Sequence, residues 1–547
     1  MDILFKKFMD EVEKNINSMN EEDLKEWILN IARQTIPEKR KNFLENFNRE
    51  DEEYINKKDM ILKLCNDINN GKIILEYEYQ DYCDDSVCAN DKGIGDKLVE
   101  AFNEVEKKLY LKNYKDALNL YEKLCDLNIS IIELTSEEDE EVDLNYLIQT
   151  DILDVDLKKI TSNYIYSKYM MADSKKRPKK IYISFCDAIY NIKLEDVMTV
   201  GPEKLPELEE FLSNFIMFLK KQDGVVASRL LREAVVYAEG SEGLSKIADE
   251  LYDKFPECYV DLCNLLYEDR KDDQVIESAT RGIEKINKNL IIRADIAEIM
   301  IKSAERANNK EMMFKGIKVA FESGVDVNNF LRLFKIPNNN EILKQAIERA
   351  EEVLEKPTQR YSYSYAEIQR KETNIIEYYY NLIRLFNFEF EYTYEICQKD
   401  KKSVGWSSSL KGVVVPIFMI LLVNKNIISK LIDKEILMFI GNMHYYNQHD
   451  HDKFIDNFKQ WIHNVNLTEE EYNKYLEWCV KEVDGRVKDI VSNQHRGAYD
   501  KAALLIVSLA EIYDSINENS GIAIIKKYRA MFPRHRAFLS EIDAIKY

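Results

Sequence analysis

Apolar residues recur every three or four positions along most of the chain, which is the period of an amphipathic helix. The clearest case covers residues 101–128, where a first helix ends at Lys112-Asn113 and a second begins near Tyr114. The expected apolar faces are Ala101, Val105 and Leu109 in the first helix, and Tyr114, Leu118, Tyr121 and Cys125 in the second. This pattern predicts an antiparallel helical hairpin.

The same kind of pattern returns in the middle of the chain. Val275, Ala279 and Gly282 share one predicted helix. A second set with the same internal spacing lies about 38 residues further on, which is the length of a helix-pair repeat. That second set is Met313, Ile317 and Ala320, and a long helix is expected between the two sets, over residues 290–307. We therefore expect an all-α fold, an α-solenoid of stacked hairpins that curls into an arc.

One stretch departs from the helical period. Residues 72–82 alternate between apolar and polar side chains, which favours a short strand or one arm of a β-hairpin.

Residues 413–423 form the longest apolar run, and it is too short for the roughly 20 residues of a membrane span. We therefore expect residues 413–423 to form a helix that is buried in the core. Further along the chain, Thr468 and Glu471 have the spacing of a capping box, which predicts the start of another helix.

Composition supports the helical interpretation. The 547 residues include only 16 Gly and 9 Pro, too few for the many turns of a β-sandwich or barrel. Hydrophobic residues make up 45% and charged residues 32%, which is typical of a globular chain. These shares exclude a disordered or collagen-like protein.

Charge and cysteine content indicate the compartment in which the protein works and the partners that it disfavours. The net charge of −21 falls mostly in residues 1–172, and an acidic surface repels nucleic acid. The nine Cys include no C-x-x-C pair, and a scattered, odd-numbered set suits a reducing compartment. The N-terminal residues lack the apolar core of a signal peptide. We expect a cytoplasmic protein without a membrane anchor.

Four parts are expected along the chain. These are N-terminal helices over residues 1–70, a hairpin region with an acidic loop over 71–172, middle solenoid repeats over 173–356, and a C-terminal helical region over 357–547. Loops are predicted at residues 133–143, 173–180, 201–206 and 356–364, and the last of these is the expected domain boundary.

The hairpin around residues 110–121 resembles a tetratricopeptide repeat. Ala117, Tyr121 and Leu124 stand at the small and large positions of the second half of that motif, whereas the opening Trp, Leu and Gly are not matched. The resemblance covers a short segment, and it implies a helical-repeat surface that binds peptides or proteins.

A broader resemblance covers much of the chain. Residues 93–95, 405–409, 496–499 and 533–538 follow one another in an order that is similar to uncharacterised helical-repeat proteins of clostridia and related bacteria. The last fifty or so residues also resemble the helical tail of SWIM zinc-finger proteins, but the zinc finger itself (C-x-C followed by C-x-H) is missing. The resemblance implies a helical fold and carries no established activity.

Two places offer groups that bind anions. A Gly/Ser loop at residues 405–412 precedes the buried helix, and backbone N–H groups at such a helix start can hold an anion. Its candidate ligands are Ser407, Ser408 and Lys411, although a turn that seats Trp406 in the core explains the same residues. The second place is a C-terminal cluster of Arg496, Arg534, His535 and Arg536, for which pairing with acidic neighbours is the alternative.

Weaker signals complete the set of candidates. The basic run of residues 175–180 is expected to be a solvated loop, with a partner contact as the alternative. His449 and His451 have the residue type of metal ligands, but their spacing does not place them on one helix face. We expect an inter-helix loop there, with no metal site.

The sequence contains no recognisable catalytic motif, so we expect neither an enzyme nor a cofactor. The favoured interpretation is an intracellular scaffold or adaptor that binds a protein or peptide on a concave surface, with some of its 33 Tyr as contact residues. The alternative is a regulator that binds a small anion, a nucleotide or nucleic acid through the C-terminal Arg/His cluster.

Overall fold

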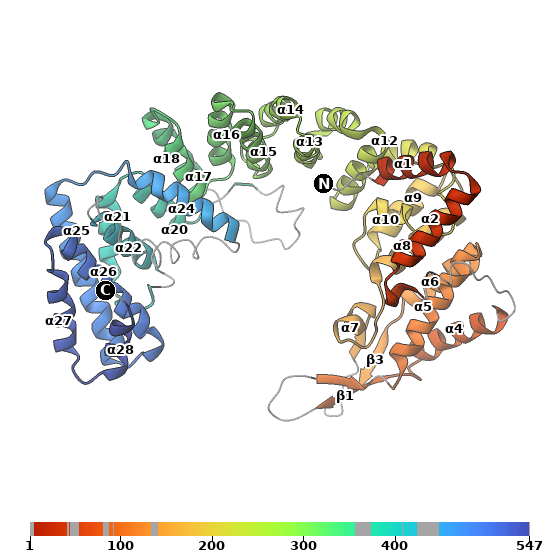
Figure 1. Ribbon diagram of the computed structural model, residues 1–547, viewed down its shortest axis with the longest axis horizontal. Helices are drawn as coiled ribbons and strands as arrows, with labels where there is room; N and C mark the ends of the chain where they lie inside the picture. The colour runs from red at the N-terminus through yellow and green to blue at the C-terminus, as the bar shows by residue number, and fades with distance from the viewer. Residues whose placement is uncertain are drawn as a thin grey trace. The chain divides into compact units, whose positions relative to one another are not determined.

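The computed structural model describes residues 5–40, 43, 54–79, 87–90, 92–132, 140–355, 372–373, 375–406, 409–423 and 448–545 (Figure 1). The chain forms two compact units, residues 1–258 and 259–547. Helices dominate both units, so the fold is of the all-α solenoid class that the sequence predicts. In the part of the chain that the structure describes, no helix is both long and apolar enough to cross a bilayer.

The first unit begins with helices and a small sheet. Its first elements are α1 (Phe5–Ser18), α2 (Glu21–Gln34), η1 (Pro37–Lys39), α4 (Tyr54–Asn69), β1 (Leu75–Tyr79), β2 (Val87–Asn90), α5 (Ile94–Tyr110) and α6 (Tyr114–Cys125). The rest are β3 (Ile129–Ile132), β4 (Glu140–Val142), α7 (Leu144–Gln149), α8 (Leu157–Met171), α9 (Arg177–Cys186), α10 (Leu194–Met198), α11 (Leu208–Leu219) and α12 (Val225–Leu251).

The four strands form one sheet in the order β2-β1-β3-β4. β1 runs parallel to β3, with Leu75 opposite Ile131, whereas β2 and β4 pair antiparallel at the edges. The chain between the two parallel strands contains β2 and then the α5–α6 hairpin. The predicted strand at residues 72–82 is confirmed, but the expectation of a loop over residues 133–143 is wrong at its end, because β4 lies there.

The α5–α6 hairpin forms where the period predicts it. Ala101, Val105 and Leu109 are buried on α5. The buried face of α6 is Ala117, Leu120, Tyr121 and Leu124, whereas Tyr114, Leu118 and Cys125 are only half-buried. The apolar face predicted for α6 is therefore displaced by about one residue from the face that is buried. The three positions of the tetratricopeptide resemblance, Ala117, Tyr121 and Leu124, are all buried.

Tyrosines of α8 hold the predicted loop at residues 201–206. The hydroxyl of Tyr166 donates to the carbonyl of Glu203, and the hydroxyl of Tyr169 donates to the carbonyl of Pro206, each at 2.8 Å. Gly201 has a positive φ of 86°, and a Cβ there would lie 2.3 Å from the Tyr166 ring. These tyrosines are core residues that fix a loop, so a large Tyr content does not by itself mark a contact surface.

The second unit contains the rest of the helices, and α13 (Glu257–Glu268) begins at the boundary. The next are α14 (Asp272–Lys285), α15 (Ile292–Arg306), α16 (Lys310–Ser323), α17 (Val327–Arg332), η2 (Leu333–Lys335), α18 (Asn340–Leu354), α20 (Glu377–Phe386) and α21 (Phe390–Lys399). The last are α22 (Lys411–Leu421), α24 (Gln448–Ile462), α25 (Glu469–Ser492), η5 (Arg496–Ala498), α26 (Tyr499–Ile516), α27 (Gly521–Met531) and α28 (Arg536–Ala544).

The repeated spacing of the middle region corresponds to consecutive packed helices. α15 packs against both α14 and α16, as the sequence offset predicts. Position 282 has no space for a side chain, because a Cβ there would lie 2.9 Å from the ring of Tyr259. Cys258 and Cys263 are fully buried in the same stack and act as apolar core residues.

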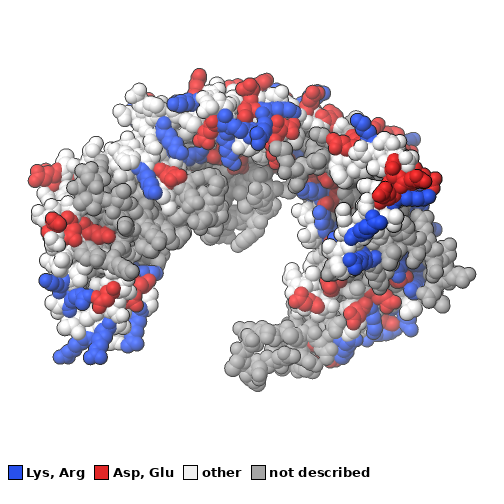
Figure 2. Space-filling model, viewed as in Figure 1, with Lys and Arg blue, Asp and Glu red and all other residues white. Residues whose placement is uncertain are grey.

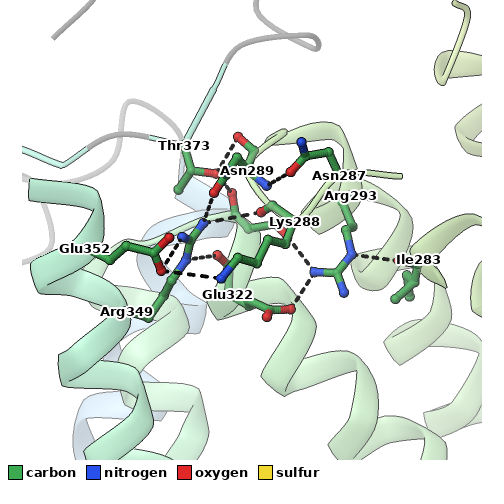
Figure 3. A network of polar contacts seen from close by, with 10 residues as sticks. Ile283, Asn287, Lys288, Asn289, Arg293, Glu322, Arg349, Glu352 and Thr373 are labelled. Atoms are coloured by element: carbon green, nitrogen blue, oxygen red, sulfur yellow. Dashed lines mark hydrogen bonds and ion pairs between the residues drawn. The ribbon is translucent and has the colours of Figure 1, made fainter. Parts of the chain in front are cut away.

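A network of polar contacts joins the ends of these helices (Figure 3). Arg349 donates from Nε to the carbonyl of Glu322 at 2.8 Å and from Nη2 to Oδ1 of Asn289 at 2.9 Å. Arg293 donates to Oε2 of the same Glu322 at 2.6 Å. The backbone N–H of Thr373 donates to the carbonyl of Asn289 at 2.6 Å, so the chain is anchored to this cluster before α20 begins.

One buried carboxyl in this stack gives a pH-dependent stability. Burial, and then the nearby Glu298, raise the pKa of Asp295 from 3.8 to about 6. Because the native carboxyl holds its proton more tightly than the unfolded one, the contribution of Asp295 to stability is greatest below pH 3.8 and is lost as pH rises through about 6. We expect Asp295→Asn to be more stable than the wild type at neutral pH and to flatten this dependence.

Urea unfolding at a series of pH values measures this effect. Asp273→Asn is the control, because Asp273 is exposed on the neighbouring α14. Equal slopes of stability against pH in Asp295→Asn and the wild type would contradict the assignment.

Candidate functional site

A groove with a volume of about 450 Å³ lies between α4 and α5 in the first unit. It forms because both helices pack on α6, which leaves a gap between their outer faces. Its apolar lining is Met60, Ile61, Leu64, Ile73 and Ala101. Met60 is 66% exposed, which leaves an apolar surface open to a partner.

Charged side chains surround this groove. Glu104 accepts from Lys57 at 3.2 Å and from Lys107 at 2.9 Å. Burial acts to raise the pKa of Glu104, but the hydrogen bonds from the two lysines outweigh it and the net pKa is lowered. Lys63 and Lys97 also line the groove, and neither forms an ion pair with any residue of the described ranges.

Sequence reasoning did not find this groove. The buried stripe of α4 is Ile61, Cys65 and Ile68, at helical spacing. Met60 is an exposed apolar residue beside that stripe. It is the feature of the sequence that could have indicated a binding groove at this place. The gap itself depends on how α4 and α5 sit on α6, which no local pattern encodes.

Lys411, a predicted anion ligand, has protein partners in the structure. Its side chain is buried at the start of α22, and Nζ lies 3.0 Å from Oε2 of Glu482. Nζ also donates to the carbonyls of Asp400 and Lys402. Ser407 and Ser408 lie outside the described residues. The alternative interpretation, a turn that seats Trp406 in the core, is confirmed because Trp406 is buried.

Arg486 lies beside this loop, and sequence reasoning missed it. Its guanidinium stacks on the ring of Trp406, at 4.6 Å from the ring centroid. Burial lowers the pKa of Arg486 to about 10. In the sequence Arg486 is one of many charged helix residues, and the approach of Trp406 from a distant segment makes it a buried one.

The C-terminal basic residues come together at one end of the last helices. The ring of Tyr499, at the start of α26, packs on the ring of Phe538 in the first turn of α28 at 5.6 Å. Arg496 immediately precedes α26, and Arg534 and Arg536 lie at the start of α28; all three are exposed. Figure 2 shows Lys and Arg gathered at this end of the bundle, at the lower left.

These arginines differ from their basic neighbours in their partners. None of Arg496, Arg534 and Arg536 forms an ion pair within the described part of the chain, whereas Arg529 pairs with Asp543. His535 is half-buried, with its ring on Phe532 at 5.7 Å. The alternative interpretation, pairing of the cluster with acidic neighbours, is thus not seen for its three arginines in the described ranges, and Asp543 pairs instead with Arg529, which lies outside the predicted cluster.

The two histidines and the basic run, which were expected in loops, lie wholly or partly in helices. His449 and His451 lie in the first turn of α24 and not in a loop, and their side chains are outside the described part. No group of three or more metal-ligating side chains occurs among the described residues. The basic run at residues 175–180 is also not all loop, because α9 begins at Arg177, which is buried and pairs with Glu207 at 3.0 Å.

Comparisons with known proteins identify no relative of this chain. No family model matches the chain, and no curated protein matches it. Among solved structures, it is similar to a circular tandem repeat protein with novel repeat topology and enhanced subunit contact surfaces, with 10% sequence identity over 98% of this chain and 88% of that chain. The TM-score is 0.14, so this likeness carries no argument. The clostridial and SWIM-tail resemblances find no support in these comparisons.

Proposed function

We propose that this chain is a protein-interaction scaffold that binds a peptide segment of a partner in the groove between α4 and α5. The observation that carries the proposal is the open apolar lining of that groove, with the exposed Met60 at its edge. Grooves of this kind accept apolar anchor side chains, and repeat proteins present such surfaces on stacked helices.

The charges around the groove define the partner's chemistry. Lys63 and Lys97 have no carboxylate partner among the described residues, whereas Asp67 pairs with Lys72 at 2.9 Å and Glu104 pairs with two lysines. Glu100 also lines the groove without an ion pair in the described ranges, so the unpaired lining charges are two lysines and one glutamate. Complementary charge across an interface favours encounter and fixes orientation. We therefore propose a segment with one or two large apolar residues flanked by Asp or Glu.

The proposal assigns no reaction and no cofactor to the chain. It places the protein in the cytoplasm, where thiols such as Cys65 and Cys397 stay reduced.

Peptide selection tests this proposal. A displayed peptide library is selected on the full chain, and enriched peptides are synthesised and measured by fluorescence anisotropy. We expect acidic–apolar peptides to be enriched, and we expect Met60→Glu to weaken their binding at least tenfold, because a carboxylate then lies on the apolar lining and repels the peptide's acidic residues.

Met217→Glu is the matched control, because Met217 is 56% exposed on α11 in the same unit. It should leave the affinity unchanged. Peptides that bind Met60→Glu as tightly as the wild type would remove the groove from the function.

A second candidate function has support from the C-terminal cluster. Arg496, Arg534 and Arg536 converge at one end of the bundle without carboxylate partners in the described ranges, as a nucleotide or nucleic-acid contact requires. If this end binds a nucleotide or an oligonucleotide, affinity should fall steeply with salt. The triple change of these arginines to Gln should abolish binding and leave peptide binding in the groove intact.

A further inference from the structure

Arg486 is a buried cation that has no counter-ion among the residues that the structure describes. Its side chain lies on α25 and is 8% exposed. Its Nε and Nη1 atoms are shielded from solvent, and within the described residues neither has a hydrogen-bond acceptor. The side chain forms no ion pair there either. A buried charge in this state is costly, because removal from water is not offset by a partner.

Glu482 lies one turn before Arg486 on α25, but its carboxylate is already engaged. Its Oε2 lies 3.0 Å from Nζ of Lys411, and its Oε1 accepts from Nε1 of Trp478 at 3.2 Å. The described cluster therefore contains two buried cations, Lys411 and Arg486, and one carboxylate. One negative charge is missing from this balance.

Trp406 adds a second donor at the same place. Its ring lies under the guanidinium of Arg486, and its indole Nε1–H is also buried without an acceptor in the described part of the chain. An indole N–H can only donate, and so can a guanidinium. Two neighbouring side chains thus carry buried hydrogen-bond donors without an acceptor among the described residues.

Two glycines next to these donors in the sequence have few or no atoms near their Cβ positions. Gly485 precedes Arg486, and a Cβ there would touch only the side chain of Ser403, at 3.6 Å. A Cβ at Gly405, next to Trp406, would have no neighbouring atom within 4 Å.

We propose that Arg486 and Trp406 form a binding site for a small oxyanion, either a carboxylate or a phosphate group. Oxyanions are the natural partners of a guanidinium, since they accept several charge-assisted hydrogen bonds at once. The ligand supplies the missing negative charge, while Lys411 and Glu482 hold the loop and helix in place. The low pKa of Arg486 is consistent with an unpaired state, and a bound anion would raise it.

This site is independent of the peptide groove. It lies in the second unit, and none of its residues lines the groove. Failure of either proposal therefore leaves the other unaffected.

Thermal unfolding of the full chain tests the site. The wild type, Arg486→Met, Trp406→Phe and Lys488→Met are each measured in sodium phosphate, sodium sulfate and sodium acetate, with sodium chloride at matched ionic strength as the reference. Lys488 is an exposed cation on the same helix and serves as the control. A ligand at one hundred times its dissociation constant shifts the folding equilibrium about a hundredfold, so a clear rise in the midpoint is expected.

Arg486→Met should lose the specific rise and should be at least as stable as the wild type in chloride, because it removes an unpaired buried charge. Trp406→Phe keeps the stacked ring and should show a reduced rise, which keeps the test valid if Arg486→Met does not fold. A response to phosphate and sulfate alone identifies a tetrahedral ligand, and a response to acetate identifies a carboxylate.

Two outcomes overturn the proposal. One is an unchanged midpoint in all three anions relative to chloride. The other is a rise of equal size in Arg486→Met, which would assign the effect to general salt exclusion or to the C-terminal arginines.

Discussion

Gly412→Ala is expected to destabilise the second unit by about 3 kcal/mol or more, because the new methyl group has no space. A Cβ at this position would lie 1.9 Å from the carbonyl oxygen of Trp406 and 2.6 Å from its carbonyl carbon. Both are backbone atoms, so no side-chain rotation relieves the clash. Lys411, the preceding residue, is tied to Glu482 and to two carbonyls, which prevents the helix start from moving away.

Urea unfolding followed by tryptophan fluorescence measures this change. Three of the four tryptophans, Trp406, Trp461 and Trp478, lie in the second unit, so the signal reports mainly on that unit. Gly497→Ala is the control, because a Cβ there has no atom within 4 Å, and it should stay within about 0.5 kcal/mol of the wild type. A Gly412→Ala protein as stable as this control would contradict the close approach of the loop to α22.

Trp461→Ala is the second change with a large expected effect, about 3–5 kcal/mol. Trp461 is fully buried on α24, and its ring contacts Phe386 at 4.8 Å and Phe458 at 5.5 Å between centroids. Its Nε1–H donates to the carbonyl of Phe386 at 2.8 Å. The change to alanine therefore removes ring packing and leaves a buried carbonyl without its donor.

Trp461→Phe separates these two contributions. It keeps most of the ring contacts and loses the hydrogen bond, so a loss of about 1–3 kcal/mol is expected. Since the fluorescence of Trp461 is itself lost in both variants, far-ultraviolet circular dichroism is the common measurement. Equal midpoints for Trp461→Ala and the wild type would show that α24 does not contribute to the cooperative core.

The helical stack was predictable because each helix buries a stripe against its neighbour along the chain. Packing between neighbouring helices of this kind appears in the sequence as apolar residues at helical spacing, such as Ala101 and Val105 on α5 or Val275 and Ala279 on α14. Of the four strands only β1 was predicted, because β2, β3 and β4 have three or four residues each and are too short to show a clear alternation. The pairing of β1 with β3 spans the whole α5–α6 hairpin, so no local pattern indicates it. β4 comprises only Glu140–Val142, beside an acidic run that indicates a loop.

The candidate sites were less predictable than the fold, because tertiary contacts create them. Lys411 was identified as an anion ligand from its loop, but Glu482, far along the chain, pairs with its charge. Arg486 has no motif, and its burial results from the approach of Trp406. For the C-terminal cluster the sequence indicated which helix starts lie together, since Tyr499 of α26 packs on Phe538 of α28, and the binding role of its arginines stays a prediction.

The parallel pairing of β1 with β3 also sets an order of folding. The contacts between α5 and α6 are local in sequence and can form early, whereas β1 must wait until the chain beyond Cys125 has been synthesised before it gains its parallel neighbour. Until then one edge of β1 has unsatisfied backbone groups, which can pair with another nascent chain. Slow translation through the segment that encodes β3 would therefore favour aggregation more than the same delay within a helix.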